Sequence, residues 1–338
     1  MGKILKLVLP AVLLILTQVP LSGCGCGFDC NSNNNSNSND PASLTLGFSD
    51  SLPEDLKQVV IEVESITLGS GADSKVINKF TIPEQGRVDE ETFQIDLLKY
   101  RGVQQLTVIE DLELPAGNYS NVSIEINADG SYVVQQADDN QKPLTVSGGT
   151  LTIPGMQLSS GNQVFTVEFG LAQALQFESA NERYLLSKTG IRIENNLTGA
   201  TLSGEVDSDL FDTESPCDEK PTPTSGNRVY LYKGSNLTSN TLADVFTTDS
   251  TTTIPDNKLA PFAVASLIED NQTENWKYAF GYMPAGDYTL AFSCNTATDD
   301  SIEYNGLIMP LPTNQVYRIK LSEKNKSICN LTTAADCK

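Results

Sequence analysis

Histidine is absent from the sequence of 338 residues. Without an imidazole the chain cannot form a Ser-His-Asp or Cys-His catalytic arrangement, and it lacks the usual general base at neutral pH and the commonest zinc ligand. Acid–base catalysis would have to use carboxylates, as in glycoside hydrolysis by a pair of Asp or Glu side chains. We therefore predict a protein that is not an enzyme, with a carboxylate-based glycan hydrolase as the alternative.

Basic residues are also few, because 22 Lys and Arg stand against 43 Asp and Glu, a formal charge of −21. Such a surface repels nucleic acid and anionic headgroups, so we expect no nucleic-acid partner. It favours divalent cations, and the nearest set of oxygen ligands is Asp207, Asp209, Asp212 and Glu214. There is neither an EF-hand spacing nor an RTX-type repeat. We predict a solvated loop and no cofactor, with a calcium-dependent binding module as the alternative.

Long apolar runs are missing apart from residues 7–16, which follow Lys3 and Lys6 and are interrupted by Pro10. This run is shorter than the roughly 20 residues that a membrane-spanning helix needs. A basic start, an apolar run and small residues at 22 and 23 are the layout of a secretory signal peptide. We predict a signal peptide over residues 1–23. A membrane anchor and an ordinary secreted protein are the alternatives.

The motif Leu21-Ser22-Gly23-Cys24 resembles the lipobox of bacterial lipoproteins. The resemblance implies cleavage between Gly23 and Cys24, a diacylglyceryl group on the Cys24 thiol and an acyl chain on the new amine, such as palmitate. The mature protein would then be anchored to a membrane by its lipid. Because Gly25 rather than Asp follows the lipidated residue, we expect the outer membrane of a bacterial cell envelope.

Six cysteines remain after Cys24, which is an even number in a chain that we expect to be exported. Disulfides persist outside the cytosol, so up to three bridges can form, although the sequence does not fix their pairing. Proximity in the sequence favours one disulfide near each end of the chain. The two cysteines that remain would form a disulfide that closes a long loop. These candidate pairs are Cys26 with Cys30, Cys329 with Cys337, and Cys217 with Cys294.

The fold class that the sequence predicts is mainly β, with two β-sandwich-like domains at residues 43–196 and 197–338 behind an Asn/Ser-rich tether at 24–42. Polar and apolar residues alternate, as strands require, at residues 43–48, 59–67, 92–97, 119–126, 164–169 and 188–193. Asp129-Gly130 predicts a hairpin over residues 124–133. One helical turn is expected at 171–177.

Several blocks of the first domain resemble one family of bacterial lipoproteins, known as domain of unknown function 4382. The blocks are Val59 to Leu68, Phe93 to Tyr100, Leu114 to Ile126, Phe165 to Leu171 and Tyr184 to Glu194. The resemblance covers about residues 43–195. It implies a β-rich exported domain and supplies no catalytic residues.

Residues 200–328 are similar to carboxypeptidase regulatory-like, or transthyretin-like, β-sandwich domains. The similarity rests on Thr201 to Val206, Asn227 to Tyr232 and Tyr278 to Phe292. It implies a structural spacer or a ligand-binding module. The protein is therefore predicted to bind, adhere or support structure at the envelope, with a surface glycan or an envelope protein as its partner.

Aromatic residues offer two further candidates for ligand contact. Pro-Ala-Gly-x-Tyr occurs twice, and we expect Tyr119 and Tyr288 to pack at the edge of a core rather than to stack on a ligand. Alternation places Trp276, Tyr278 and Tyr282 on one face of a strand. We predict that these three also fill the core, with stacking on sugar rings as the alternative.

Overall fold

The computed structural model describes residues 40–51, 56–136, 139–211, 215–219, 225–248, 250–270, 275–332 and 336–337. The predictions for Gly23, Cys24, Cys26 and Cys30 and for most of the tether fall outside these residues, as does Asp212. Residues 38–338 form one compact unit. The boundary at residue 196 stays a prediction.

The chain is mainly β, as predicted. Helix in the described residues amounts to α1 (Leu171–Ala174) and five short 3-10 turns. The α1 turn lies within the predicted residues 171–177, but it ends at Ala174 because residues 175–178 pair with another strand. No helix in the described part of the chain is long and apolar enough to cross a membrane.

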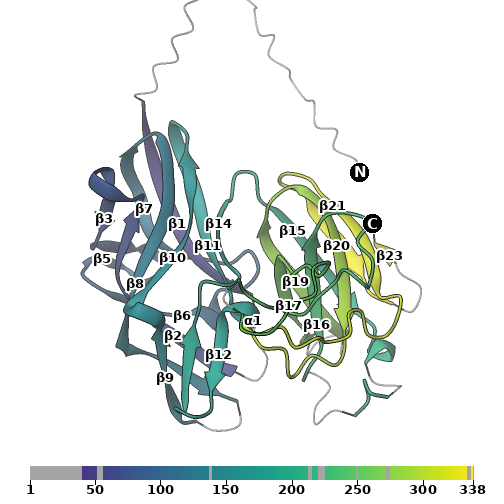
Figure 1. The fold of residues 1–338 in the computed structure, drawn as a ribbon. Helices are drawn as coiled ribbons and strands as arrows, with labels where there is room; N and C mark the ends of the chain where they lie inside the picture. The colour runs from purple at the N-terminus through teal and green to yellow at the C-terminus, as the bar shows by residue number, and fades with distance from the viewer. Residues whose placement is uncertain are drawn as a thin grey trace, which may run out of the picture. The chain divides into compact units, whose positions relative to one another are not determined.

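The N-terminal half contains a four-stranded and an eight-stranded sheet (Figure 1). The four-stranded sheet has the order β14 (Ile191–Asn195), β11 (Gly161–Gly170), β1 (Pro41–Ser51), β7 (Leu106–Pro115), and only its β1–β11 pair is parallel. Alternate β1 residues Leu44, Leu46 and Phe48 are fully buried, because successive side chains of a strand point to opposite faces. The polar–apolar alternation in the sequence thus marks a strand with one face in the core.

The eight-stranded sheet is built around two long strands, β2 (Leu56–Leu68) and β8 (Gly117–Gln135). Its order is β12 (Leu175–Glu178), β13 (Arg183–Leu186), β9 (Gln141–Val146), β8, β2, β3 (Lys75–Ile77), with β10 (Thr150–Leu158) on β8 and β6 (Phe93–Asp96) on β2. Strands β4 (Phe80–Ile82) and β5 (Arg87–Glu90) form a two-stranded sheet of their own.

The hairpin predicted over residues 124–133 is wrong, because these residues belong to the single strand β8, which pairs with β2 along its length. Val60 pairs with Tyr132 and Glu62 with Asn127, so residues 128–131 bulge out of the ladder. The Ser131 hydroxyl fills the gap: it donates to the Asn127 carbonyl at 2.6 Å and accepts from the Glu62 amide at 3.0 Å. The Asp-Gly signal marked a real irregularity, and the long partner strand made it a bulge instead of a turn.

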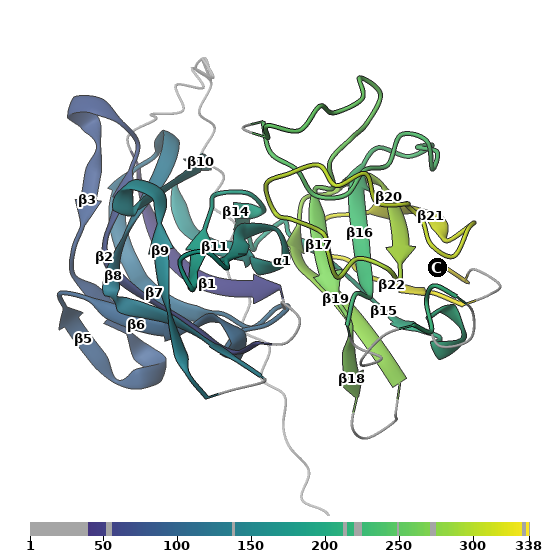
Figure 2. The same ribbon diagram turned by 60° about the horizontal axis from the view of Figure 1, so that its bottom comes forward.

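The C-terminal half has two sheets, seen in green and yellow in Figure 2. One has the order β18 (Ile268–Asp270), β19 (Asn275–Met283), β15 (Ala200–Val206), β22 (Lys326–Asn330), β23 (Asp336–Cys337). The other has the order β17 (Ala263–Ser266), β16 (Arg228–Lys233), β20 (Gly286–Ser293), β21 (Val316–Leu321). Leu202 and Phe280 from the first sheet share a buried cluster with Leu290 and Phe292 from the second. This core is separate from the N-terminal one, and the arrangement is that of a β-sandwich.

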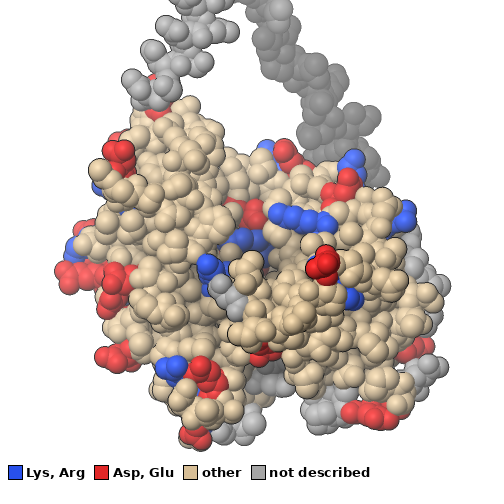
Figure 3. Space-filling view, in the orientation of Figure 1, with Lys and Arg blue, Asp and Glu red and all other residues tan. Residues whose placement is uncertain are grey.

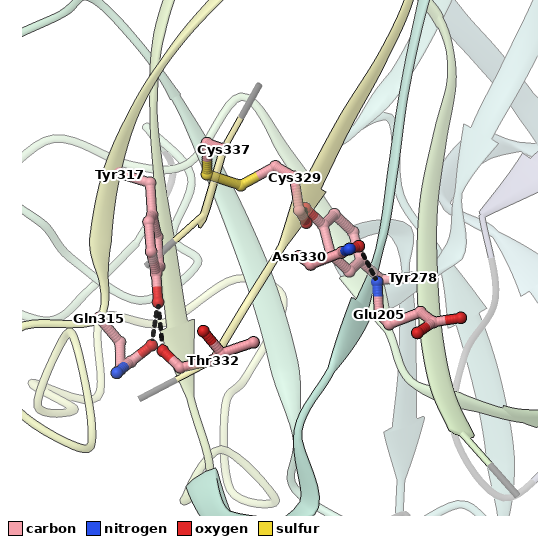
Figure 4. The surroundings of a disulfide bond; sticks show 8 residues. All are labelled: Glu205, Tyr278, Gln315, Tyr317, Cys329, Asn330, Thr332 and Cys337. Atoms are coloured by element: carbon pink, nitrogen blue, oxygen red, sulfur yellow. Dashed lines mark hydrogen bonds between the residues drawn. A yellow bond between two sulfur atoms is a disulfide. The ribbon is translucent and has the colours of Figure 1, made fainter. Parts of the chain in front are cut away.

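Disulfides join Cys329 to Cys337, the pairing that proximity favoured, and Cys217 to Cys294, the pairing that remained. The bridge between Cys329 and Cys337 joins the paired strands β22 and β23 (Figure 4). Beside it the Tyr278 hydroxyl donates to the Cys329 carbonyl at 2.7 Å, and the Glu205 amide donates to the Asn330 side chain at 3.0 Å. Strand β22 is therefore fastened to β15 and β19 by side-chain hydrogen bonds, in addition to its ladder with β15.

Candidate functional site

A cavity of about 1000 Å³ opens among the loops of the C-terminal half. Its walls come from the segment between β16 and β17 and from the segment between β20 and β21, which Figure 2 shows as long loops. The residues that line it are Leu237, Thr238, Ser239, Asn240, Asn257, Lys258, Tyr304, Gly306, Leu307, Ile308, Met309, Pro310, Thr313, Asn314 and Val316. Loops held by a rigid β scaffold are common places for binding sites.

The first wall is a pair of chain segments that bond to each other. Leu242 and Leu259 form a β-bridge, and the Leu259 amide donates to the Thr241 carbonyl at 2.8 Å. The Lys258 Nζ donates to the Leu242 carbonyl at 2.7 Å, and the Asn257 side chain donates to the Asn240 carbonyl at 3.3 Å. Backbone and side-chain hydrogen bonds thus hold these two segments in one arrangement.

The second wall is tied to the first by carboxylates behind the cavity. Asp244 Oδ2 accepts from the Leu307 amide at 2.8 Å, a bond across 63 residues of sequence. Asp299 accepts from the Val245 amide at 3.1 Å and from the Tyr230 hydroxyl at 2.6 Å. Because hydrogen bonds to charged groups are the stronger ones, these carboxylates fix the loops that shape the cavity.

The same carboxylates have shifted pKa values. Burial raises the pKa of Asp244 to about 6, although the bond from the Leu307 amide opposes this shift. Burial also raises the pKa of Asp299, against the lowering effect of Arg228. Glu303 differs, because hydrogen bonds from Thr252 and Thr251 lower its pKa to about 2. All three accept hydrogen bonds that hold the loops in place.

The cavity lining itself contains no Asp or Glu among the described residues. It offers side-chain amides and hydroxyls next to apolar side chains, of which Ile308 is 67% exposed. Two carboxyl groups across a cleft are what glycoside hydrolysis requires. The described lining can therefore bind and orient a ligand, but it does not supply a carboxylate pair for turnover.

Among the candidate calcium ligands, Asp207 has a structural role. Asp207 caps the 3-10 turn Ser208–Leu210, because its Oδ1 accepts from the Asp209 amide at 3.1 Å. No group of three or more His, Cys, Asp or Glu in the described part of the chain is arranged to hold a metal ion. The acidic loop thus uses at least one of its carboxylates for its own backbone.

The three aromatic residues of β19 do not share one environment. Tyr278 is buried in the core, and Trp276 packs against its edge, edge-to-face with Phe211 at 5.5 Å between ring centroids. Tyr282 has a φ of +48° at a β-bulge, and its hydroxyl donates to the Val103 carbonyl of the N-terminal half. Core packing is confirmed for Tyr278, and the bulge explains why the predicted alternation fails at Tyr282.

The residues that line the cavity were not identified from the sequence. They lie in two stretches without strand pattern, between residues 233 and 263 and between 293 and 316, each longer than most connections in compact domains. Such long segments are commonly functional, which is the signal that could have found them. Their pairing could not have been read from the sequence, since it depends on contacts such as that of Asp244 with Leu307.

Charged groups are interspersed on the face of the molecule that Figure 3 shows, with acidic and basic side chains side by side.

One charge cluster is buried: Glu168 is fully inaccessible, and Arg192 Nη2 lies 3.8 Å from its Oε1. Arg192 Nε also lies 3.3 Å from Glu194 Oε1, and Nη2 donates to the Gly281 carbonyl at 3.1 Å. This cluster links strands of both halves and has no cavity of its own among those described.

Comparison with protein families matches residues 41–187 to the family described as Domain of unknown function (DUF4382). The match supports the resemblance seen in the sequence blocks of the N-terminal half. No curated protein matches the chain. The similarity of residues 200–328 to carboxypeptidase regulatory-like domains stays a prediction.

Among solved structures the chain is similar to the Bacillus anthracis TIE protein, with 8% identity and a TM-score of 0.19 over 88% of this chain and 34% of that one. It thus spans about a third of that protein's length. A putative cell adhesion protein from Bacteroides fragilis gives 10% identity and a TM-score of 0.21, covering 88% of this chain and 96% of the other. The tip fimbrial protein Mfa3 from Porphyromonas gingivalis gives 9% identity and a TM-score of 0.19, covering 88% of this chain and 98% of the other. TM-scores this low do not indicate a shared fold.

Proposed function

We propose that the protein is a lipid-anchored component of a bacterial envelope, attached through Cys24, that binds a surface ligand in the loop cavity without transforming it. The observation that carries the proposal is the cavity itself: about 1000 Å³, with amides, hydroxyls and the exposed Ile308 in its walls and no carboxylate in the described lining. Pockets that mix apolar surface with a few fixed polar groups are typical of ligand sites.

The sequence supports the location and the mode of action. The lipobox-like motif at residues 21–24 and the Asn/Ser-rich segment after it would tether the folded part to a membrane. The absence of histidine removes the commonest general base, and the described cavity lining provides no carboxylate pair to replace it. Binding, adhesion or scaffolding at the outer membrane is therefore favoured over hydrolysis.

The anchor is tested by Cys24→Ala. We expect the wild-type protein in the membrane fraction with an acyl mass on its N-terminal residue, since two or more acyl chains are enough for stable attachment. The variant should be absent from the membrane fraction and should carry no acyl mass. Wild-type protein that fractionates as soluble and carries no acyl mass would disprove the anchor.

The binding site is tested with the full-length protein in detergent and an immobilised envelope fraction from cells lacking it. Ile308→Asp places a charge in the cavity, whereas Val88→Asp places one at a site that is 66% exposed in the N-terminal half. We expect the wild type and Val88→Asp to be retained and Ile308→Asp to lose at least tenfold in affinity. Equal retention of both variants would show that the cavity is not the binding site.

A further inference from the structure

The charges around the loop cavity restrict the ligand that it can take. Lys258 is the only charged residue in the described lining, and its Nζ is engaged by the Leu242 carbonyl at 2.7 Å. An anionic ligand would meet no uncommitted cation there and would approach a protein of formal charge −21. A cationic ligand would meet no carboxylate in the described lining. The cavity therefore suits an uncharged ligand.

The polar groups of the cavity match hydroxyls. Asn240, Asn257 and Asn314 each carry a donor and an acceptor on one side chain, and Thr238, Ser239 and Thr313 add hydroxyls. All six residues are exposed. A sugar hydroxyl is likewise donor and acceptor, so either orientation of such a pair makes a hydrogen bond. A ligand dense in hydroxyls would use this lining most fully.

The apolar groups give the ligand a second requirement. Ile308 stands 67% exposed beside Leu307 and Pro310, and the half-buried ring of Tyr304 lines the same space. Exposed apolar side chains with a polar rim mark binding sites. A pyranose ring satisfies both requirements, because its C–H face is apolar and its edge carries hydroxyls.

A peptide fits the cavity less well. Peptides that bind by main-chain hydrogen bonds add to an open strand edge. Here all of the lining except Val316, the first residue of β21, comes from loops. The volume of about 1000 Å³ lies at the upper end of small-ligand pockets, roughly 300–1000 Å³, and has room for more than one sugar ring.

We propose that the loop cavity binds a short segment of an uncharged glycan, a specificity that rests on the proposed function. Asn257 and Asn314, on opposite walls, contact ligand hydroxyls, and Ile308 with Tyr304 covers an apolar ring face. Asp244 acts behind them as a positioning residue, because it holds the Leu307 amide and thereby the second wall.

The test uses full-length protein in a detergent without a sugar headgroup and calorimetric titration with neutral trisaccharides of glucose, mannose, galactose and N-acetylglucosamine. We expect at least one to bind with a Kd of about 1 mM or tighter. Asn257→Ala with Asn314→Ala should weaken that binding at least tenfold. Asn118→Ala, an exposed Asn beside a different cavity, is the matched control and should leave it unchanged.

Two probes separate the alternatives. A galacturonic acid trisaccharide tests an anionic ligand, and a neutral Gly/Ser/Ala hexapeptide tests a peptide. Binding of either one in place of the neutral sugars, lost in Ile308→Asp, would overturn the glycan assignment, as would the failure of every neutral trisaccharide to bind. If envelope retention still depends on Ile308 in that case, the proposed function stands and only the ligand class is wrong. Retention that is independent of Ile308 refutes the proposed function itself.

Discussion

The two Pro-Ala-Gly-x-Tyr turns, one in each half of the chain, have the same local structure. In the first, the Tyr119 hydroxyl donates to the Pro115 carbonyl at 3.0 Å. In the second, the Tyr288 hydroxyl donates to the Pro284 carbonyl at 2.9 Å. In each the Gly begins a strand, β8 or β20. Five residues of sequence are therefore enough to set the turn and the bond that closes it.

The surroundings of the two tyrosines differ. Tyr119 is partly exposed, packs against the edge of the N-terminal core and lines an open cavity of about 450 Å³. Tyr288 is 2% exposed, and its ring centroid lies 6.1 Å from that of Phe262. Burial raises the pKa of both, and for Tyr288, where Glu194 adds to the effect, to about 12. The predicted packing is confirmed, and the comparison shows that identical local motifs differ in burial because of the sheets around them.

The largest expected effect comes from removing each ring. Tyr288→Ala should lower the free energy of unfolding by about 3–5 kcal/mol, as for other large buried side chains. Tyr119→Ala should cost about 1–2 kcal/mol, because its ring is partly in water already. Denaturant unfolding followed by the fluorescence of Trp276, the single tryptophan, measures the first, and circular dichroism the second. Equal losses would show that burial is not what separates the two turns.

The next effect concerns the disulfides, which among the described residues occur in the C-terminal half. Replacing Cys217 and Cys294 together by Ser should cost about 3 kcal/mol, because their bridge joins residues 77 apart and restricts the unfolded chain. Cys329 and Cys337 are only 8 apart, so their replacement should cost less. A greater loss from the short bridge would contradict the chain-entropy explanation.

A pH dependence follows from the buried carboxyls near the second turn. Burial raises the pKa of Glu168 and of Glu194 to about 7, although Arg192 opposes this. The folded pKa lies above the unfolded value of about 4.3, so the stabilising contribution is complete below that value and is lost as the pH rises through 7. We expect unfolding at pH 5.5 to require about 2 kcal/mol more than at pH 8 for one such group.

Glu168→Gln is the control for this titration, because the amide keeps the shape of the side chain and cannot ionise. Its unfolding free energy should vary less between pH 5.5 and pH 8 than that of the wild type. A wild-type protein that is more stable at pH 8 than at pH 5.5 would contradict the buried-carboxyl explanation.

The smallest effect isolates the closing hydrogen bond. Tyr288→Phe should cost about 1 kcal/mol, because it leaves the Pro284 carbonyl without its donor in a partly buried place. Tyr119→Phe should cost less, since water can replace the hydroxyl at the exposed turn. Thermal unfolding of the two variants at one pH compares them directly. An equal decrease in Tm would show that the contribution of this hydrogen bond depends on the local motif and not on burial.

The sequence by itself determined the β class, the buried face of β1 and the turn at α1, and it favoured the short disulfide between Cys329 and Cys337. These features depend on short-range pattern and on the parity and proximity of cysteines, so they can be read from residues close together in the chain. The closing bond of each Pro-Ala-Gly-x-Tyr turn belongs with them, since donor and acceptor are four residues apart.

Only the tertiary structure decided whether a local signal became a turn or a bulge, and which loops met. Asp129-Gly130 is a bulge because β2 offers a partner on both sides of it. Asp244 reaches Leu307 across 63 residues, and together with the Asn257 segment this contact encloses the cavity. Hydrogen bonds and packing between distant segments leave no periodic pattern in the sequence from which they could be predicted. The groups of the binding site therefore come together only in the fold.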